Sequence, residues 1–131
     1  MPVVAEVMRS DNIVKAPPTA TLREAARLMA ENNVGSVLIV ADGGRLEGIF
    51  TERDLTRKVA EHVDLDKEKL EDHMTRNPIT ARPSESLASA AHKMIAHGIR
   101  HLPVVDEAGR LIGVVSIRDV LRSIVGEHEF P

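Results

Sequence analysis

The 131-residue chain contains no cysteine, no tryptophan and no tyrosine, and its only Phe residues are Phe50 and Phe130. Without cysteine there is no disulfide framework, no thiol nucleophile and no thiolate metal ligand. Without aromatic platforms, a bound base must be held by aliphatic side chains and backbone. Single-stranded nucleic acid would also lack the stacking that supplies much of its affinity. These absences favour a small-molecule binder over a nucleic-acid binder.

Excess positive charge and long apolar runs are also missing. Lys and Arg number 17 against 20 Asp and Glu, which gives a net charge of -3 and excludes a basic nucleic-acid footprint. The longest apolar run covers residues 37–41, far short of the roughly 20 residues that span a bilayer. The first residues lack the charged and apolar regions of a secretory signal. We therefore predict a cytoplasmic location, with no membrane and no nucleic-acid partner.

The chain does contain an internal repeat, which is the primary clue to its fold. A shift of 65 residues superimposes the two halves over nearly their whole length. The coinciding residues include Leu22 with Leu87, Met29 with Met94, Val40 with Val105, and Arg53-Asp54 with Arg118-Asp119.

Each half predicts the same order of elements: a brief strand, a helix, two strands joined by a hairpin turn, and a second helix. A capping box begins at Thr21 and a serine cap at Ser86, and the two helices end at Asn33 and Gly98, which tolerate a left-handed cap. The predicted strands cover residues 37–40, 46–50, 102–105 and 111–115, and the second helices begin at Thr51 and Ser116.

This order predicts a mixed α/β (α+β) fold made of two β-α-β-β-α repeats. One small sheet cannot cover its own apolar face, so we expect the repeats to pack sheet to sheet about a pseudo-two-fold axis. The predicted boundaries are residues 1–60 for the first repeat, 61–73 for a connecting acidic helix, and 74–131 for the second repeat. The cleft created by such packing is the expected ligand site.

The two passages from the last strand into the second helix share the pattern Gly-x-x-Ser/Thr-x-Arg-Asp, at Gly48–Asp54 and Gly113–Asp119. One interpretation is structural, because Ser/Thr with an acid three residues later forms a capping box. The other is functional, because a carboxylate there can accept hydrogen bonds from ribose hydroxyls at a helix N-terminus. The arginines could bind phosphate or pair with neighbouring acids, and the glycines could admit a ligand or ease the strand path.

Three further segments are characteristic: Val7-Met8, His73-Met74-Thr75 and the stretch Gly98–Asp106. Together with the two Gly-x-x-Ser/Thr-x-Arg-Asp segments, they resemble the cystathionine-beta-synthase (CBS) domain. The whole chain is similar to a stand-alone tandem CBS pair, or Bateman module. The resemblance implies a regulatory sensor that binds an adenosyl ligand in the cleft between its repeats and signals by conformational change. The implied ligands are AMP, ADP, ATP, S-adenosylmethionine or an NAD-type molecule, with no catalytic cofactor and no metal.

The resemblance also implies two ligand sites, each composed of both repeats. The first would comprise Thr51, Arg53, Asp54, Ile79, Thr80, Arg100, His101 and Pro103, and the second Val14, Lys15, Ser36, Ser116, Arg118 and Asp119. In this scheme Thr51 and Asp54 hold one ribose, and Ser116 and Asp119 the other.

The implied sites differ at the phosphate. The first repeat has Gly35-Ser36 where the second has Arg100-His101, so the site completed by the latter pair is expected to be selective for phosphate. We also expect its affinity for nucleotide to rise as the pH falls from about 8 to 6, because a histidine beside phosphate is readily protonated.

No Gly-x-Ser-x-Gly, P-loop or Gly-x-Gly-x-x-Gly pattern is present, and we predict that the chain is not an enzyme. The alternatives are a nucleotide hydrolase with Asp54 or Asp119 as base, and a purely structural dimerisation module without a ligand. Val59, Leu121 and Ile124 extend the apolar stripe of the second helices. We therefore predict a homodimer, whose ligand-dependent change is read by an unidentified protein target.

Overall fold

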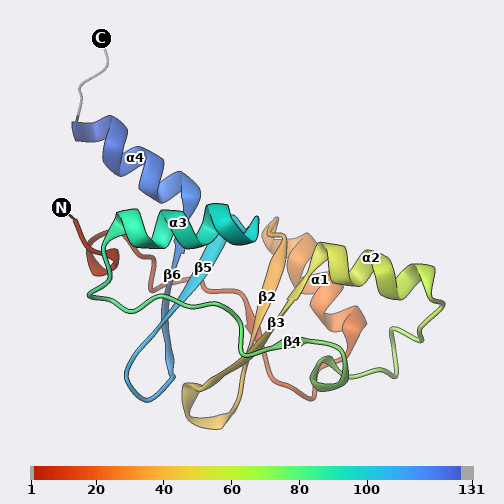
Figure 1. Cartoon of the computed structure of the whole chain (residues 1–131). Helices are drawn as coiled ribbons and strands as arrows, with labels where there is room; N and C mark the ends of the chain where they lie inside the picture. Colours follow the sequence, from red (N-terminus) through yellow and green to blue (C-terminus); the bar gives the residue numbers. More distant parts are fainter. Residues whose placement is uncertain (1, 128–131) are drawn as a thin grey trace. The chain divides into compact units, whose positions relative to one another are not determined.

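The computed structural model describes residues 2–127 as two compact units (Figure 1). The central unit is Val14–Pro78, and the terminal unit joins the residues up to Ile13 to those from Ile79 onward. Each unit contains two α-helices and a β-hairpin, so the predicted mixed α+β class is confirmed. No helix in residues 2–127 has the length and apolar character needed to cross a membrane.

The central unit is a four-stranded sheet with two helices. Its elements are β1 (Lys15–Ala16), α1 (Leu22–Asn32), β2 (Ser36–Val40), β3 (Leu46–Thr51), α2 (Glu52–Ala60) and β4 (Thr75–Arg76). The strand order is β1-β2-β3-β4, with β1 parallel to β2 and the other pairs antiparallel. Leu22, Ile39 and Phe50 are fully buried in its core, because the apolar stripe of α1 packs on the apolar strands.

The terminal unit repeats this plan with α3 (Leu87–His97), β5 (His101–Val105), β6 (Leu111–Ser116) and α4 (Ile117–Glu127). Strands β5 and β6 form an antiparallel hairpin, and a single parallel bridge joins Ala81 to Val104 on one side of it. On the other side, an antiparallel bridge joins Arg9 to Val114. These two bridges occupy the places that β1 and β4 hold in the central unit. Each hairpin lies beside its own two helices (Figure 1).

The predicted helix ends are confirmed. Thr21 Oγ1 accepts from the Glu24 amide and Glu24 Oε2 from the Thr21 amide, each over 3.1 Å, which completes the capping box of α1. Ser86 caps α3 by accepting from the Ser89 amide. Asn33 and Gly98 adopt the left-handed conformation, with φ of 52° and 64°.

Residues 61–73 do not form the predicted acidic helix. The structure has only a short 3-10 turn there, at Leu70–Asp72. The first two amides of α1 donate to the carbonyls of Glu68 and Leu65, over 3.1 and 2.9 Å. The segment thus satisfies the unpaired N-terminal amides of α1 and contributes Leu70 to the core. These tertiary contacts override the helix propensity of its polar residues.

Each hairpin receives its outer strand from the chain that leads into the other repeat. The backbone after Met74 pairs with β3, and the backbone after Met8 pairs with β6. A Cβ on Gly48 would lie 2.6 Å from Met74 Sδ, and one on Gly113 would lie 2.8 Å from Met8 Sδ. Both distances are too short for real atoms, so these glycines make room for a neighbouring segment of the same chain.

Candidate functional site

The exit from β3 into α2 is a reciprocal cap. Asp54 Oδ2 accepts from the amide and from the hydroxyl of Thr51, each over 2.9 Å, and Thr51 Oγ1 accepts from the Asp54 amide over 3.2 Å. Ser36 is the direct partner of Thr51 on the neighbouring strand β2. The capping interpretation of this motif is therefore correct for the protein as it stands.

The exit from β6 into α4 has two of these three hydrogen bonds. The Ser116 amide donates to Asp119 Oδ2 over 3.1 Å, and the Asp119 amide donates to Ser116 Oγ over 3.0 Å. His101 on β5 is the direct partner of Ser116. The backbone carbonyl of Arg100 accepts from the amide of Ile117, the first residue of α4. Ser116, Asp119 and the strand partner His101 thus all stand at the N-terminus of α4.

In both exits the hydrogen bonds of the cap are made to one carboxylate oxygen, Oδ2, and not to the other, Oδ1. Among the described residues, no hydrogen bond is made to Oδ1 of Asp54 or of Asp119. Asp54 is half-buried, whereas Asp119 is only 9% exposed. A carboxylate can accept several hydrogen bonds, so at each exit one oxygen beside the positive end of a helix dipole retains the capacity to accept a hydrogen bond.

The two acceptors differ in their electrostatic surroundings. Nη2 of Arg9 and Nη1 of Arg122 each lie 3.8 Å from Asp119 Oδ1. Neither arginine is among the predicted site residues. Arg122 could have been found from its spacing of three residues after Asp119 on a helix. Arg9 could not, because its position depends on the bridge between Arg9 and Val114.

His101 has a lowered pKa. Partial desolvation of the ring is the main cause, the positive charge of Arg100 is the next, and Arg9 and Arg118 add to it, while Asp119 acts in the opposite direction. In the protein without ligand, these groups therefore disfavour the protonated imidazole. The expectation that nucleotide affinity rises between pH 8 and 6 concerns the complex with phosphate and stays a prediction. A bound phosphate would have to overcome the surrounding positive charge before the imidazole gained a proton.

The segments predicted to line the base lie at the edges of the two sheets. Val14 packs against the core of the central unit, and Lys15 on β1 is exposed. In the terminal unit, Ile79 packs against the core, Thr80 is half-buried and Pro103 on β5 is buried. Each edge thus combines a partly buried apolar side chain with backbone polar groups. Groups of these two kinds could hold a base where no aromatic side chain is available.

The predicted sets combine residues of both units, and they stay predictions. Within single units, the structure places Ser36 beside Thr51, and His101 beside Ser116. Arg53 and Arg118 are both exposed, and neither forms an ion pair with any residue between 2 and 127. The salt-bridge interpretation of these two arginines is therefore not supported, and their guanidinium groups are available to an anion.

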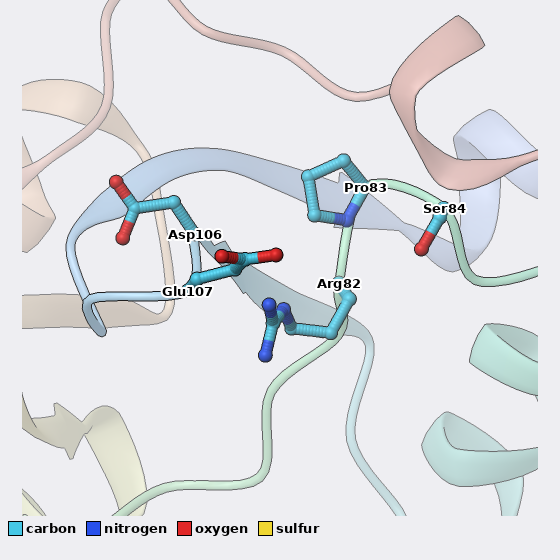
Figure 2. A pocket seen from close by; sticks show the side chains of 5 residues that line it. All are labelled: Arg82, Pro83, Ser84, Asp106 and Glu107. Atoms are coloured by element: carbon cyan, nitrogen blue, oxygen red, sulfur yellow. The ribbon is translucent and has the colours of Figure 1, made fainter.

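A hollow of about 270 Å³ lies elsewhere in the terminal unit, beside the β5–β6 turn (Figure 2). It is lined by Arg82, Pro83, Ser84, Asp106 and Glu107. Asp106 accepts hydrogen bonds from two turn amides and from Arg110, and Figure 2 shows its carboxylate directed away from Arg82. This carboxylate is committed to the turn, and the hollow contains none of the predicted site residues.

A family model and two solved structures that match the chain are of the CBS type. The family model of the CBS domain matches the chain twice, at residues 4–61 and 70–126. A CBS domain protein from Pyrobaculum aerophilum, PAE2072, solved in complex with AMP, superimposes with a TM-score of 0.84. It is 37% identical, with 96% of this chain and 97% of that one covered. The CBS domain pair of MJ0100, solved with 5′-methylthioadenosine and S-adenosyl-L-methionine, gives a TM-score of 0.83 at 31% identity, covering 97% and 98%.

Curated relatives are longer than this chain. A homoserine O-acetyltransferase from Methanohalophilus mahii is 40% identical over 95% of this chain, which spans 24% of that protein. An uncharacterised 17.7 kDa protein from Acidianus ambivalens is 37% identical over 85% of this chain, which spans 66% of it. In the first case, the matched region is a minor part of the relative.

Proposed function

The chain belongs to the CBS domain family, of which it carries two copies, and from this premise we propose that it is a regulatory module that binds an adenosyl ligand. In this proposal, the ligand changes the conformation of the module, and a protein target that remains to be identified reads the change. Because the ligand class is that of intracellular nucleotides, we propose that the module acts in the cytoplasm.

The observation that carries the proposal is one carboxylate oxygen at each strand-to-helix exit that accepts no hydrogen bond in the described part of the chain. That of Asp119 is paired with Arg9 and Arg122 at 3.8 Å. The cap bonds fix the orientation of Asp54 and Asp119 through Oδ2 and leave Oδ1 without a hydrogen bond among the described residues. The 2′ and 3′ hydroxyls of a ribose are donors that fit such an acceptor. The capping and ribose-binding interpretations are therefore compatible, because they use different oxygens of one carboxylate.

The relatives support the ligand class. AMP, 5′-methylthioadenosine and S-adenosylmethionine, found with PAE2072 and MJ0100, share adenosine and differ in the group on the 5′ carbon. A site that reads the shared part needs ribose acceptors and an apolar place for the base. Both exits of this chain supply the acceptor, and both sheet edges supply the apolar side chain.

We propose no catalytic role for the chain itself. Its likeness to the homoserine O-acetyltransferase is confined to 24% of that protein's length, which fits an appended regulatory part better than a catalytic one. Incubation with ATP, followed by analysis for ADP or AMP, tests the hydrolase alternative. Product formed by the wild type and abolished in an Asp54→Ala, Asp119→Ala double variant would overturn this proposal.

Thermal unfolding with a panel of ligands tests the binding function. AMP, ADP, ATP, NAD, S-adenosylmethionine and 5′-methylthioadenosine are compared with GMP as control. A ligand at 100 times its Kd adds about 2.7 kcal/mol to the stability of the folded state, and the double variant should lose this gain. A wild-type protein that none of these ligands stabilises would leave the structural dimerisation module as the better hypothesis.

We also propose that two chains associate through the second helices. Leu121 and Ile124 on α4 and Val59 on α2 are 54%, 49% and 55% exposed, so the apolar faces of both second helices are only partly covered within the chain. Covering them with a second copy would remove this surface from water. Sedimentation at micromolar concentration should give about twice the 14.3 kDa of one chain. A 14.3 kDa species would refute this proposal.

A further inference from the structure

The two segments predicted to line the base, one in each unit, differ in the backbone hydrogen bonds that attach them to the neighbouring strand. In the central unit, the Leu38 amide donates to the Val14 carbonyl over 3.1 Å, and β1 pairs regularly with β2. The residue that corresponds to Leu38 in the second repeat is Pro103. Proline has no backbone N–H, so the same bond to Ile79 is impossible. Pairing in the terminal unit is accordingly reduced to the single bridge at Ala81.

A lysine supplies a replacement contact. Lys93 Nζ, on α3, donates to the Thr80 carbonyl over 2.9 Å and to Glu85 Oε1 over 2.8 Å. Glu85 Oε2 in turn accepts from the hydroxyl of Ser89 over 2.7 Å. The side chains of Lys93 and Glu85 are only 35% and 14% exposed. The Ile79–Thr80 edge, which lacks the strand hydrogen bond, is thus connected to α3 by the partly buried ion pair of Lys93 and Glu85, called the clamp below.

The charge of this clamp is maintained near neutral pH. Burial by itself raises the pKa of Glu85, but the hydrogen bonds from Lys93, Ser89 and the Arg82 amide outweigh it, so the pKa lies below its ordinary value. Glu85 therefore remains a carboxylate and holds Lys93 by a charge-assisted hydrogen bond. Such a bond fixes direction better than a contact between neutral groups.

The first repeat has no counterpart of the clamp. Leu28 stands at the position of Lys93, Ala20 at that of Glu85, and Glu24 at that of Ser89. Glu24 is used in the capping box of α1. The lysine and the glutamate therefore occur in the repeat that contains the proline, and the repeat with a regular strand pair lacks both.

We infer that Lys93, held by Glu85, is a positioning residue that fixes the Ile79–Thr80 edge for recognition of the adenine base. This inference rests on the proposed adenosyl-binding function. The Thr80 carbonyl is occupied by Lys93, whereas the Ile79 carbonyl has no donor among residues 2–127. A fixed acceptor suits the 6-amino group of adenine and disfavours the 6-oxo group of hypoxanthine, which cannot donate.

The test compares AMP with IMP by calorimetry, using a Lys93→Leu, Glu85→Ala double variant. This variant installs the residues of the first repeat and avoids leaving one charge partly buried and unpaired. At one binding step, AMP affinity should fall by about tenfold and IMP affinity should change little, because about one well-oriented hydrogen bond is lost. Lys93→Arg should retain more of the preference, because it keeps the donor and the charge.

Hydrogen exchange provides a second readout. Faster exchange of the Ala81 and Val105 amides, which bond across this edge, with the rest of the terminal unit unchanged, is the expected local effect. If AMP and IMP affinities fall equally, or neither changes, the inference is wrong while adenosyl binding stands. If the wild type binds neither nucleotide nor any other adenosyl ligand, the proposed function itself fails.

Discussion

Asp54 Oδ2 lies 2.9 Å from both the amide nitrogen and the hydroxyl oxygen of Thr51, so a single carboxylate oxygen closes the cap of α2. The same carboxylate has a second oxygen that these bonds do not use. One side chain can therefore stabilise the helix and remain an acceptor for a ligand. At α4, Asp119 Oδ2 likewise accepts from the Ser116 amide, and Ser116 Oγ accepts from the Asp119 amide.

The first prediction separates these two roles. Asp54→Ala should destabilise the fold by about 1 kcal/mol, because the cap is lost. It should also lower AMP affinity at one site by about tenfold or more, because hydrogen bonds to a charged acceptor are lost. Calorimetry and urea unfolding measure the two effects.

Glu24→Ala is the matched control, because Glu24 plays the same capping role on α1 outside the exits. It should cost similar stability and leave AMP affinity unchanged. Unchanged affinity in both Asp54→Ala and Asp119→Ala would reduce the exit motif to a helix cap.

The second prediction concerns the close approach of chain segments at two glycines. Gly48→Ala and Gly113→Ala should each destabilise the fold by about 1–3 kcal/mol, because the added methyl overlaps Met74 or Met8. Gly48→Ala should have the larger effect, since its Cβ would also lie 2.7 Å from the Thr75 carbonyl oxygen, against 3.0 Å from the Arg9 carbonyl for Gly113→Ala.

Gly126→Ala is the control, because a Cβ there meets nothing within 4 Å on an α-helix. It should be neutral or stabilising by up to about 1 kcal/mol. Urea midpoints for the three variants check the order, and a Gly48→Ala protein as stable as Gly126→Ala would contradict the register of β4 on β3.

The sequence predicted local structure better than long-range structure. Helix caps at Thr21, Ser86, Asn33 and Gly98 could be predicted, because capping depends on residues within one turn. The failure of the predicted helix in residues 61–73 has the opposite cause. Its backbone bonds to the start of α1, a contact between segments some 40 residues apart, and no local pattern encodes that contact.

The candidate site shows the same division. The exit acids could be found because the motif occurs twice, and their caps follow from spacing. The approach of Arg9 to Asp119 could not be predicted, because it depends on the pairing of Arg9 with Val114 on β6, far away in the sequence. Nor could the contact between Lys93 and Thr80, although the absence of an N–H at Pro103 signalled that the edge needed another partner.

The third prediction concerns pH and His101. Its folded-state pKa is lower than that of an exposed histidine, about 6.5, so the unfolded chain binds the proton more tightly. The associated stability is fully present above the unfolded pKa and is lost as the pH falls from there through the folded pKa. His101→Gln should therefore reduce the loss of stability between about pH 7 and 5.

Urea unfolding at several pH values measures this difference, with His92→Gln on the exposed side of α3 as control. The slope should flatten in His101→Gln, and the His92→Gln protein measures the effect of exchanging an exposed histidine for glutamine. Identical slopes for wild type and His101→Gln would mean that the positive groups around the ring do not act on it in solution.

The last prediction uses the difference between the repeats at the phosphate. Replacing Arg100→Gly and His101→Ser gives the second repeat the residues of the first, Gly35-Ser36, at the start of β5. AMP affinity should fall by about tenfold or more at one site and adenosine affinity should change little, because a guanidinium binds phosphate oxygens through charge-assisted bonds. The salt dependence of AMP binding should weaken as well.

Lys67→Ala, which removes an exposed charge outside the exits, is the control and should preserve the preference for AMP. Equal losses for AMP and adenosine would show that Arg100 and His101 shape the site without reading the phosphate. No loss for either ligand would place the phosphate at other cations, of which Arg53 and Arg118 are exposed and without an ion pair in the described part of the chain.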